Sequence, residues 1–181
     1  MVLGLLEGKK VNLRVMEKED IPLFSEWCNN LEFFGEFEWL PQRSRAEHEK
    51  RYDAFTSDTN TKRFIIEKKD GTKIGNVVHF LTGSLLEIGY ELVPNERGKG
   101  YCTEAVKIIV DYLFLSKDLP RIQAQTDPRN VASQKVLEKA GFTKEGTLRK
   151  SYLVRGEWTD SLIYSILREE WKEPKILTKT V

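Results

Sequence analysis

The residues that say most about chemistry lie at 95–105 (NERGKGYCTEA), where a glycine-rich loop leads into an amphipathic segment. Gly98 and Gly100 let the backbone approach a ligand without obstruction by a Cβ atom. The amides of the helix that follows would point outward with the positive end of its dipole behind them, and Arg97 and Lys99 would add mobile positive charge. The pattern predicts a phosphate-binding loop, and the alternative is a basic surface turn with a glycine cap.

Two well-known phosphate-binding loops differ from this one in spacing. A P-loop requires a longer glycine spacing and a Gly-Lys pair followed by Ser or Thr, whereas Lys99 is followed by Gly100. A dinucleotide fingerprint requires a third glycine and an acidic residue at a later strand end, and the sequence has neither at that spacing. The loop therefore disfavours nucleoside triphosphates and NAD as ligands.

Groups for acid–base or nucleophilic chemistry also occur. Glu87 and Glu91 share one face of a predicted strand, because side chains alternate with a period of two. Cys102 falls in the first turn of the predicted helix, where the pKa of a thiol is lowered, but we favour a small space-filling residue because no histidine lies nearby in the sequence. His48 and His79 have no partner pattern and are interpreted as structural or surface residues.

Composition limits the classes of function. The 181 residues are enough for one domain, 1–181, with a core of its own. Lysine and arginine total 29 against 28 acidic residues, so no overall field favours nucleic acid and an anion site must be local. Cys28 and Cys102 lack metal-ligand spacing, which disfavours a zinc site or disulfide scaffold and favours a reducing cytoplasm. We find no pattern of a membrane span or secretory signal.

Periodicity and turn residues predict the elements that must position these groups. In the first half, Pro22 after Asp20 indicates a helix start, and Ser44 with Glu47 forms a capping box. Residues 31–44 are predicted to be irregular. The predicted elements are a strand at 10–15, helices at 20–30 and 44–56, and strands at 62–68, 73–81 and 85–93 with turns at 70–71 and 82–84.

In the second half, the clearest helix follows the glycine loop, because apolar residues from Ala105 to Leu113 repeat at helical spacing. A helix capped by Asn130 and Gly141 is also predicted. The chain beyond Trp171 is predicted to be weakly ordered. The remaining elements are a strand at 121–126 and a hairpin of 142–154 and 157–166, so the order predicts a mixed α/β domain with the phosphate loop at its centre.

These motifs resemble the GNAT superfamily of acetyl-CoA-dependent N-acetyltransferases over nearly the whole chain. The strongest likeness is 88–94 (IGYELVP) running into 97–101 (RGKGY), and a second is Asn130-x-x-Ser133 followed by 137–142 (LEKAGF). Gly-x-Trp-x-Asp at 156–160 and a later Glu-Trp are similar to the RimJ/RimL branch of ribosomal-protein N-terminal acetyltransferases. The resemblance implies a central, mostly antiparallel twisted sheet of about seven strands flanked by about four helices.

The resemblance also implies acetyl-CoA as cosubstrate, with no metal. Amides of the glycine loop would hold the pyrophosphate, and amides at the end of the preceding strand would bind the pantetheine arm and polarise the thioester. Asn95 departs from the Gln or Arg of the family pattern, but the loop amides supply most of the expected contacts. The implied cofactor-binding residues are Leu92, Val93, Arg97, Gly98, Lys99, Gly100, Tyr101, Cys102, Thr103, Asn130 and Ser133.

For catalysis, the resemblance implies Glu87 as the base, with a solvated edge carboxylate as the alternative, and Ser133 or Tyr152 as the acid for the CoA sulfur. Two further family positions for a glutamate hold Gln125 and Ser151. An α-amine with a pKa of about 7.7 to 8.0 is partly neutral at pH 7, whereas a lysine amine at about 10.4 is not. The missing bases therefore count more against a lysine acceptor than against an α-amine.

The resemblance places the acceptor site at an aromatic segment, and packing in the core is the alternative explanation for these aromatic residues. The glutamates at 32, 36 and 38 either attract a cationic amine or form a solvated run of charge. A protein N-terminus is the leading acceptor. The alternatives are a small amine (antibiotic, polyamine or amino acid), a non-catalytic acetyl-CoA-binding module, and a ribosome-associated protein, which the neutral charge disfavours. A homodimer is left open, and neither nucleic acid nor membrane is expected as a partner. The expected substrate-binding residues are Trp27, Phe34, Trp39 and Glu91.

Overall fold

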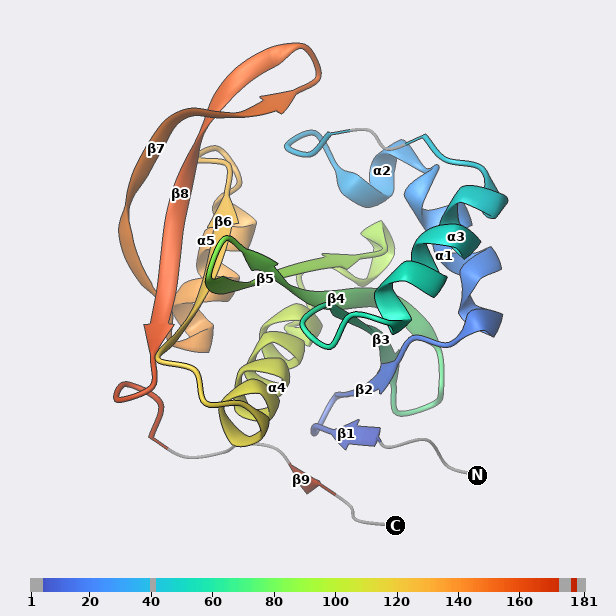
Figure 1. Cartoon of the computed structure of the whole chain (residues 1–181), viewed down its shortest axis with the longest axis horizontal. Coiled ribbons are helices and arrows are strands. Elements are labelled where there is room, and N and C mark those ends of the chain that lie inside the picture. Colours follow the sequence, from blue (N-terminus) through green and yellow to red (C-terminus); the bar gives the residue numbers. More distant parts are fainter. Residues whose placement is uncertain (1–4, 40–41, 173–176, 179–181) are drawn as a thin grey trace.

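The computed structural model of the chain describes residues 5–39, 42–172 and 177–178. The strands in this part form one nine-stranded sheet in the order β7-β8-β6-β5-β4-β3-β2-β1-β9 (Figure 1). Neighbours are antiparallel except β5 and β6, which run parallel. The strands are β1 (Leu5–Glu7), β2 (Val11–Val15), β3 (Lys62–Lys68), β4 (Lys73–Thr82), β5 (Leu85–Leu92), β6 (Arg121–Thr126), β7 (Thr143–Val154), β8 (Glu157–Leu167) and β9 (Leu177–Thr178).

Helices cover both faces of this sheet (Figure 1). On β3, Phe64 and Ile66 belong to one buried cluster and Ile65 to another, because neighbouring residues of a strand point to opposite faces. The first cluster contains the apolar residues of α4 and α5, and the second those of α1 and α2. The helices are α1 (Ile21–Cys28), α2 (Leu31–Phe34), α3 (Arg45–Thr56), α4 (Tyr101–Ser116) and α5 (Val131–Ala140), with 3-10 turns at Lys18–Asp20 and Pro94–Glu96.

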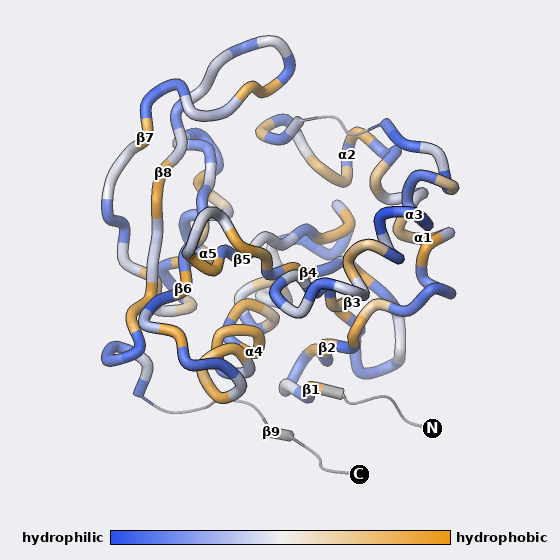
Figure 2. The backbone as a smooth tube through the Cα atoms, viewed as in Figure 1, coloured by the Kyte–Doolittle hydropathy of each residue, from blue (hydrophilic) through white to orange (hydrophobic). Residues whose placement is uncertain are grey.

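Local signals fix the ends of the helices beside the site. The Ser44 hydroxyl accepts the amide of Glu47 at 3.3 Å and the Glu47 carboxylate accepts the amide of Ser44 at 2.8 Å, which confirms the capping box of α3. The side chain of Asn130 accepts the amide of Ser133 at 3.0 Å, and Gly141 ends α5 with φ 101°. Helix α4 is mostly hydrophobic in Figure 2, and its apolar side lies in the core.

The parallel pair β5 and β6 separates along its length. The two strands are paired only at Leu86 with Ile122 and at Glu87 with Gln123. Strand β5 continues to Leu92, still paired with β4. The edge of β5 from residue 88 onward is therefore open on the side of β6, and α4 begins just beyond the end of β5 (Figure 1).

The mixed α/β, mostly antiparallel fold is confirmed, with differences in number. The described residues hold nine strands and five α-helices, where the sequence predicts about seven and four, because the two- and three-residue strands β9 and β1 and the four-residue helix α2 give no periodic signal. The prediction of an irregular segment at 31–44 is wrong where α2 forms. The tail predicted to be weakly ordered lies partly outside the described residues. In the described part, no helix is long and apolar enough to cross a membrane.

Candidate active site

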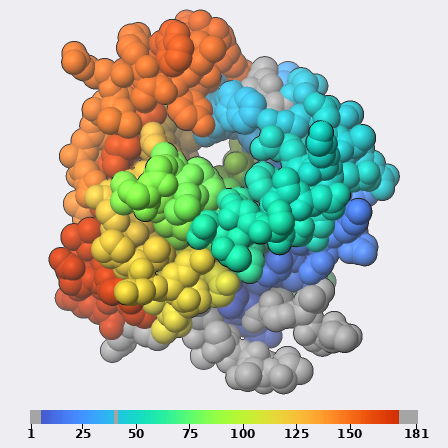
Figure 3. All heavy atoms as spheres, in the orientation of Figure 1, coloured from blue at the N-terminus to red at the C-terminus, as the bar shows by residue number. Residues whose placement is uncertain are grey.

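A cavity of about 1160 Å³ lies where β5 and β6 separate. Its walls come from α1–α3 on one side, from α4 and α5 on the other, and from the hairpin of β7 and β8. Figure 3 shows the molecule hollowed between this hairpin and the helices of the N-terminal half. Arg155, at the tip of the hairpin, donates a hydrogen bond of 2.6 Å to the carbonyl of Gly35, so the hairpin reaches across to the loop that follows α2.

The glycine loop stands at one end of the cavity. Gly98 and Gly100 have φ of 76° and 83°, a left-handed conformation that favours glycine, and Gly100 is the N-cap of α4. No side chain caps α4 among the described residues, so its first-turn amides keep their donors for a ligand. The Glu104 carboxylate in this turn accepts the amides of Lys9 and Lys10 at 3.1 and 2.6 Å, which fixes the start of α4 against the turn before β2.

Arg97 has a different place from the one predicted. Its guanidinium donates to the carbonyls of Leu92, Glu32 and Phe33 at 3.1, 2.8 and 2.6 Å. The prediction of mobile positive charge is wrong for this side chain, because it is held between α2 and the end of β5. Lys99 likewise pairs with Glu96 at 3.0 Å but is half exposed. The backbone of the loop is therefore its main contribution to anion binding.

The strand end offers one amide to the opening rather than two. Val93 donates its amide to the carbonyl of Ile74 at 2.9 Å, so the expected contact of this amide with a ligand is wrong. Leu92 is paired opposite Gly75, and bonded and non-bonded pairs alternate along an antiparallel ladder. The amide of Leu92 therefore points away from β4, toward the gap between β5 and β6.

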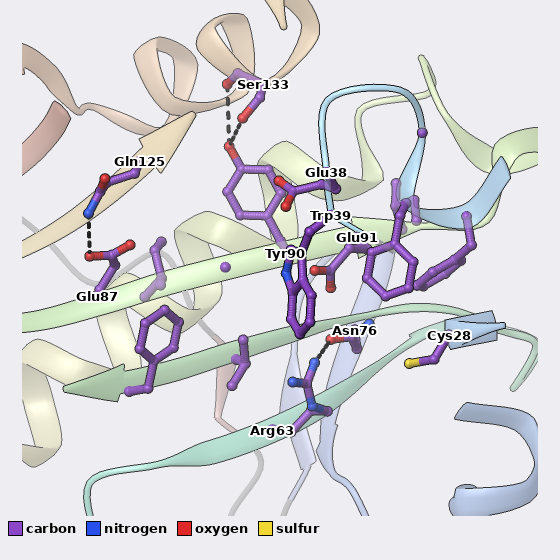
Figure 4. A pocket seen from close by; sticks show the side chains of 18 of the residues that line it. Cys28, Glu38, Trp39, Arg63, Asn76, Glu87, Tyr90, Glu91, Gln125 and Ser133 are labelled. Carbon is purple, nitrogen blue, oxygen red and sulfur yellow. Dashed lines mark hydrogen bonds between the residues drawn. The ribbon is translucent and has the colours of Figure 1, made fainter. Parts of the chain in front are cut away.

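A pair of hydroxyl groups lies where β5 faces the start of α5. The Tyr90 hydroxyl lies 2.8 Å from the Ser133 Oγ, and Ser133 is placed by the cap of α5 (Figure 4). Burial raises the pKa of Tyr90, so its phenol stays protonated at neutral pH. Burial also raises the pKa of the Cys102 thiol, with a further rise from Glu91, which makes this cysteine a filler of space and not a thiolate nucleophile.

Glu87 lies at the point where β5 and β6 part. Its Oε2 accepts hydrogen bonds from Gln123 at 2.9 Å and from Gln125 at 3.2 Å, both on β6. Figure 4 shows the bond from Gln125. The side chain is buried and lines the cavity. The alternative interpretation of Glu87 as a solvated edge carboxylate is therefore wrong. Gln125 cannot act as a base itself, but it holds the Glu87 carboxylate, which could act as one.

Two further carboxyl groups gather in the cavity, as Figure 4 shows for Glu38 and Glu91. Burial raises the pKa of Glu38 to about 7, with a smaller contribution from the negative charges of Glu91 and Asp127. Burial also raises the pKa of Glu91, and its Oε2 is buried without a hydrogen-bond partner. The hydroxyl of Tyr152 has a raised pKa from burial and from Glu38, Glu87 and Glu91, so it lies beside this group and keeps its proton.

The predicted aromatic wall is only partly in the cavity. Phe34 and Trp39 line it, as do Glu91 and Tyr152. Trp27 is buried in the core, where it stacks on a phenylalanine at 5.3 Å, and it is not among the lining residues. Trp27 is therefore a packing residue, which agrees with the alternative explanation of core packing for the aromatic segment.

Residues 10–143 match the family model described as "Acetyltransferase (GNAT) domain". The chain belongs to the GNAT acetyltransferases. It is 36% identical to the probable N-acetyltransferase YjcK of Bacillus subtilis, over 92% of this chain and 98% of that protein. The crystal structure of a Vibrio cholerae spermidine N-acetyltransferase with CoA and spermine matches with a TM-score of 0.82 and 23% identity, over 90% and 98%. The structure of RimL, a ribosomal L7/L12 α-N-protein acetyltransferase, in complex with CoA matches with a TM-score of 0.81 and 18% identity, over 90% of this chain and 97% of that chain.

As a GNAT acetyltransferase, this protein uses acetyl-CoA as the acetyl donor, which the open β5 edge and the uncapped start of α4 fit. Two cavity residues were missed by the sequence interpretation. Tyr90 lies on the face of β5 opposite to Glu87 and Glu91, and the alternation of side chains along the strand could have placed it toward Ser133. Glu38 had no local signal, because its place depends on how the loop after α2 packs.

Proposed function

We propose that this acetyltransferase acetylates the α-amine of a protein N-terminus by direct transfer. The observation that carries the proposal is the group of Glu38, Glu91 and Tyr152 beside the open edge of β5. A carboxylate with a pKa of about 7 is matched to an α-ammonium, whose pKa is about 7.7 to 8.0, and is poorly matched to a lysine ammonium at about 10.4. We assign Glu38 as the general base that takes the proton from the amine.

The donor would lie along the α4 and α5 side. The amides of Gly98 to Thr103 would hold the pyrophosphate, with Lys99 as an exposed cation, and the Leu92 amide would donate to the thioester oxygen as it gains charge. Asn130 and Ser133 would contact the pantetheine arm from the start of α5. Tyr101 and Cys102 pack against the core beneath the loop, and they shape this site without reacting.

Three cavity residues serve the transfer itself. Glu87, held by its two glutamines, would orient the amine or a water next to it. Ser133 and Tyr152 are the two hydroxyl donors for the leaving thiolate. We expect Tyr152→Phe to lower kcat and to leave the Kd for CoA unchanged if Tyr152 is the acid. Ser133→Ala would have that effect if Ser133 is the acid.

A polyamine is the second candidate acceptor, and the acidic residues of the cavity favour it, as does the Vibrio structure that holds spermine. The two candidates are separated by CoA release with N-terminal peptides, lysine-blocked peptides, spermidine and spermine at equal concentration. Activity with peptides whose lysines are blocked supports the proposal. Activity confined to polyamines would refute it. We also propose a cytoplasmic homodimer, in which the exposed edge strand β7 pairs between copies, and sedimentation at micromolar concentration tests it.

A further inference from the structure

Three arginines line one end of the cavity. Arg43, Arg51 and Arg63 are all lining residues, and among the described residues none of them forms an ion pair with a carboxylate. Each guanidinium lies over an aromatic ring, at 5.0 Å for Arg43, 5.4 Å for Arg51 and 4.6 Å for Arg63. A guanidinium stacked in this way presents its edge N–H groups to a ligand. Arg63 also donates to the Asn76 side chain.

A histidine completes this end of the cavity. His48 on α3 is buried and lines the cavity, and its Nε2 has no hydrogen-bond partner. Burial lowers the pKa of His48, and the three arginines lower it further, so the imidazole and the guanidinium groups lie close to one another. An anion bound at this end would give the imidazole N–H and the guanidinium groups a hydrogen-bonding partner of opposite charge.

The opposite charge gathers elsewhere in the same cavity. The charged neighbours of Glu38 are Glu91 and Asp127, whereas those of Arg43 are Arg51 and Glu47. Arg63 lies at the boundary, because its charged neighbours are Glu91 on one side and Arg51 and Arg43 on the other. The cavity therefore changes from acidic near the gap between β5 and β6 to basic near α3. A polyamine, which carries only positive charge, would meet the arginines at this second end.

We propose that the acceptor is a primary amine that also carries a carboxylate or phosphate, bound by Arg43, Arg51 and Arg63 while its amine lies beside Glu38 and Glu91. This inference rests on the proposed function, because it assigns the acceptor to the same cavity. The anion is either a side chain near the N-terminus of a polypeptide or part of a free small amine. Both sources present the same chemistry to the arginines.

Acceptor pairs with and without an anionic group test the proposal. Peptides with Asp or Glu at positions 2 and 3 are compared with the Asn and Gln peptides, and glutamate is compared with its diamide at equal concentrations of the neutral amine, because amidation of the α-carboxylate lowers the pKa of the amine. We expect the anionic member of one pair to have at least a tenfold higher kcat/KM, and the pair that responds identifies the source. Equal values in both pairs, or faster turnover of spermidine, would overturn the inference and leave acetyl transfer to amines intact.

A binding test works without turnover. With CoA saturating, so that the glycine loop is filled, we expect inorganic phosphate to raise the melting temperature of the wild type relative to chloride at equal ionic strength. Arg51→Gln, at an exposed position, should lose this shift, and Arg63→Gln should lose it too. Arg45→Gln is the matched control, because Arg45 lies on the same helix, pairs with Glu49 and is outside the cavity lining.

The two failures can be told apart. A phosphate-induced shift that Arg51→Gln abolishes, in a protein that acetylates no amine, would contradict the proposed function and uphold the anion site. A shift of the same size in the wild type, Arg51→Gln and Arg45→Gln would refute the anion site. The absence of a shift in the wild type would refute it as well.

Discussion

Glu38→Gln should make the enzyme slower and, above neutral pH, more stable. The carboxyl of Glu38 has a pKa of about 7 in the folded protein against 4.5 for an ordinary glutamate, because partial burial and two acidic neighbours disfavour its ionised form. The ionised carboxylate is therefore destabilised in the folded protein. This destabilisation is the source of both the expected loss of rate and the expected gain in stability. Loss of a general base typically lowers the rate about 10²- to 10⁴-fold.

The stability effect has a definite sign. A raised carboxyl pKa gives stability that is complete below pH 4.5 and is lost as the pH rises through about 7. At 1.36 kcal/mol per unit, the loss is about 3 kcal/mol at most. Glutamine keeps the neutral form, so the variant should equal the wild type at pH 4 and exceed it at pH 8.5 in urea denaturation.

The pH profile of kcat/KM gives an independent readout. With Glu38 as base, the ionised carboxylate takes the proton from the ammonium, so the wild-type rate rises near pH 7 and stays high at alkaline pH, where the amine is already neutral. In Glu38→Gln only the neutral amine reacts, and the rate should rise to a plateau above pH 8. Glu32→Gln is the control, because Glu32 is exposed and outside the cavity lining. A variant that keeps the wild-type profile and gains no stability would refute this assignment.

The other predictions concern the donor site and its supports. Gly98→Glu should raise the Kd for CoA at least tenfold by calorimetry, and Gly83→Glu, also at positive φ with open space but on a hairpin turn, should not. Glu104→Ala should lower the free energy of unfolding by about 3 kcal/mol in urea, because three backbone amides lose their acceptor, and Glu49→Ala, which removes only a surface ion pair with Arg45, should cost under about 1 kcal/mol. Glu87→Gln should lower kcat without changing the Kd for CoA, and an unchanged kcat would remove Glu87 from the transfer step.

The sequence predicts best what depends on neighbours along the chain. Ser44 with Glu47, and Asn130 with Gly141, define helix ends through contacts within three or four residues or a single backbone conformation. The donor loop is readable for the same reason. The acceptor side is not, because the loop after α2 is placed by contacts with residues far along the chain, such as Arg155 at the tip of the hairpin. No local pattern marks Glu38 as different from the glutamates beside it.

Arg97 joins these two kinds of information. In the sequence it belongs to the glycine loop and suggests a phosphate ligand, yet its guanidinium binds the carbonyls of Leu92, Glu32 and Phe33. The bond to Leu92 falls at the end of β5 whose amide faces the donor, and the other two hold α2, which begins the acceptor wall. Because one side chain spans both, the Leu92 amide that we propose to polarise the thioester and the proposed acceptor wall keep a fixed relation to each other. Direct transfer between two bound substrates needs that fixed relation.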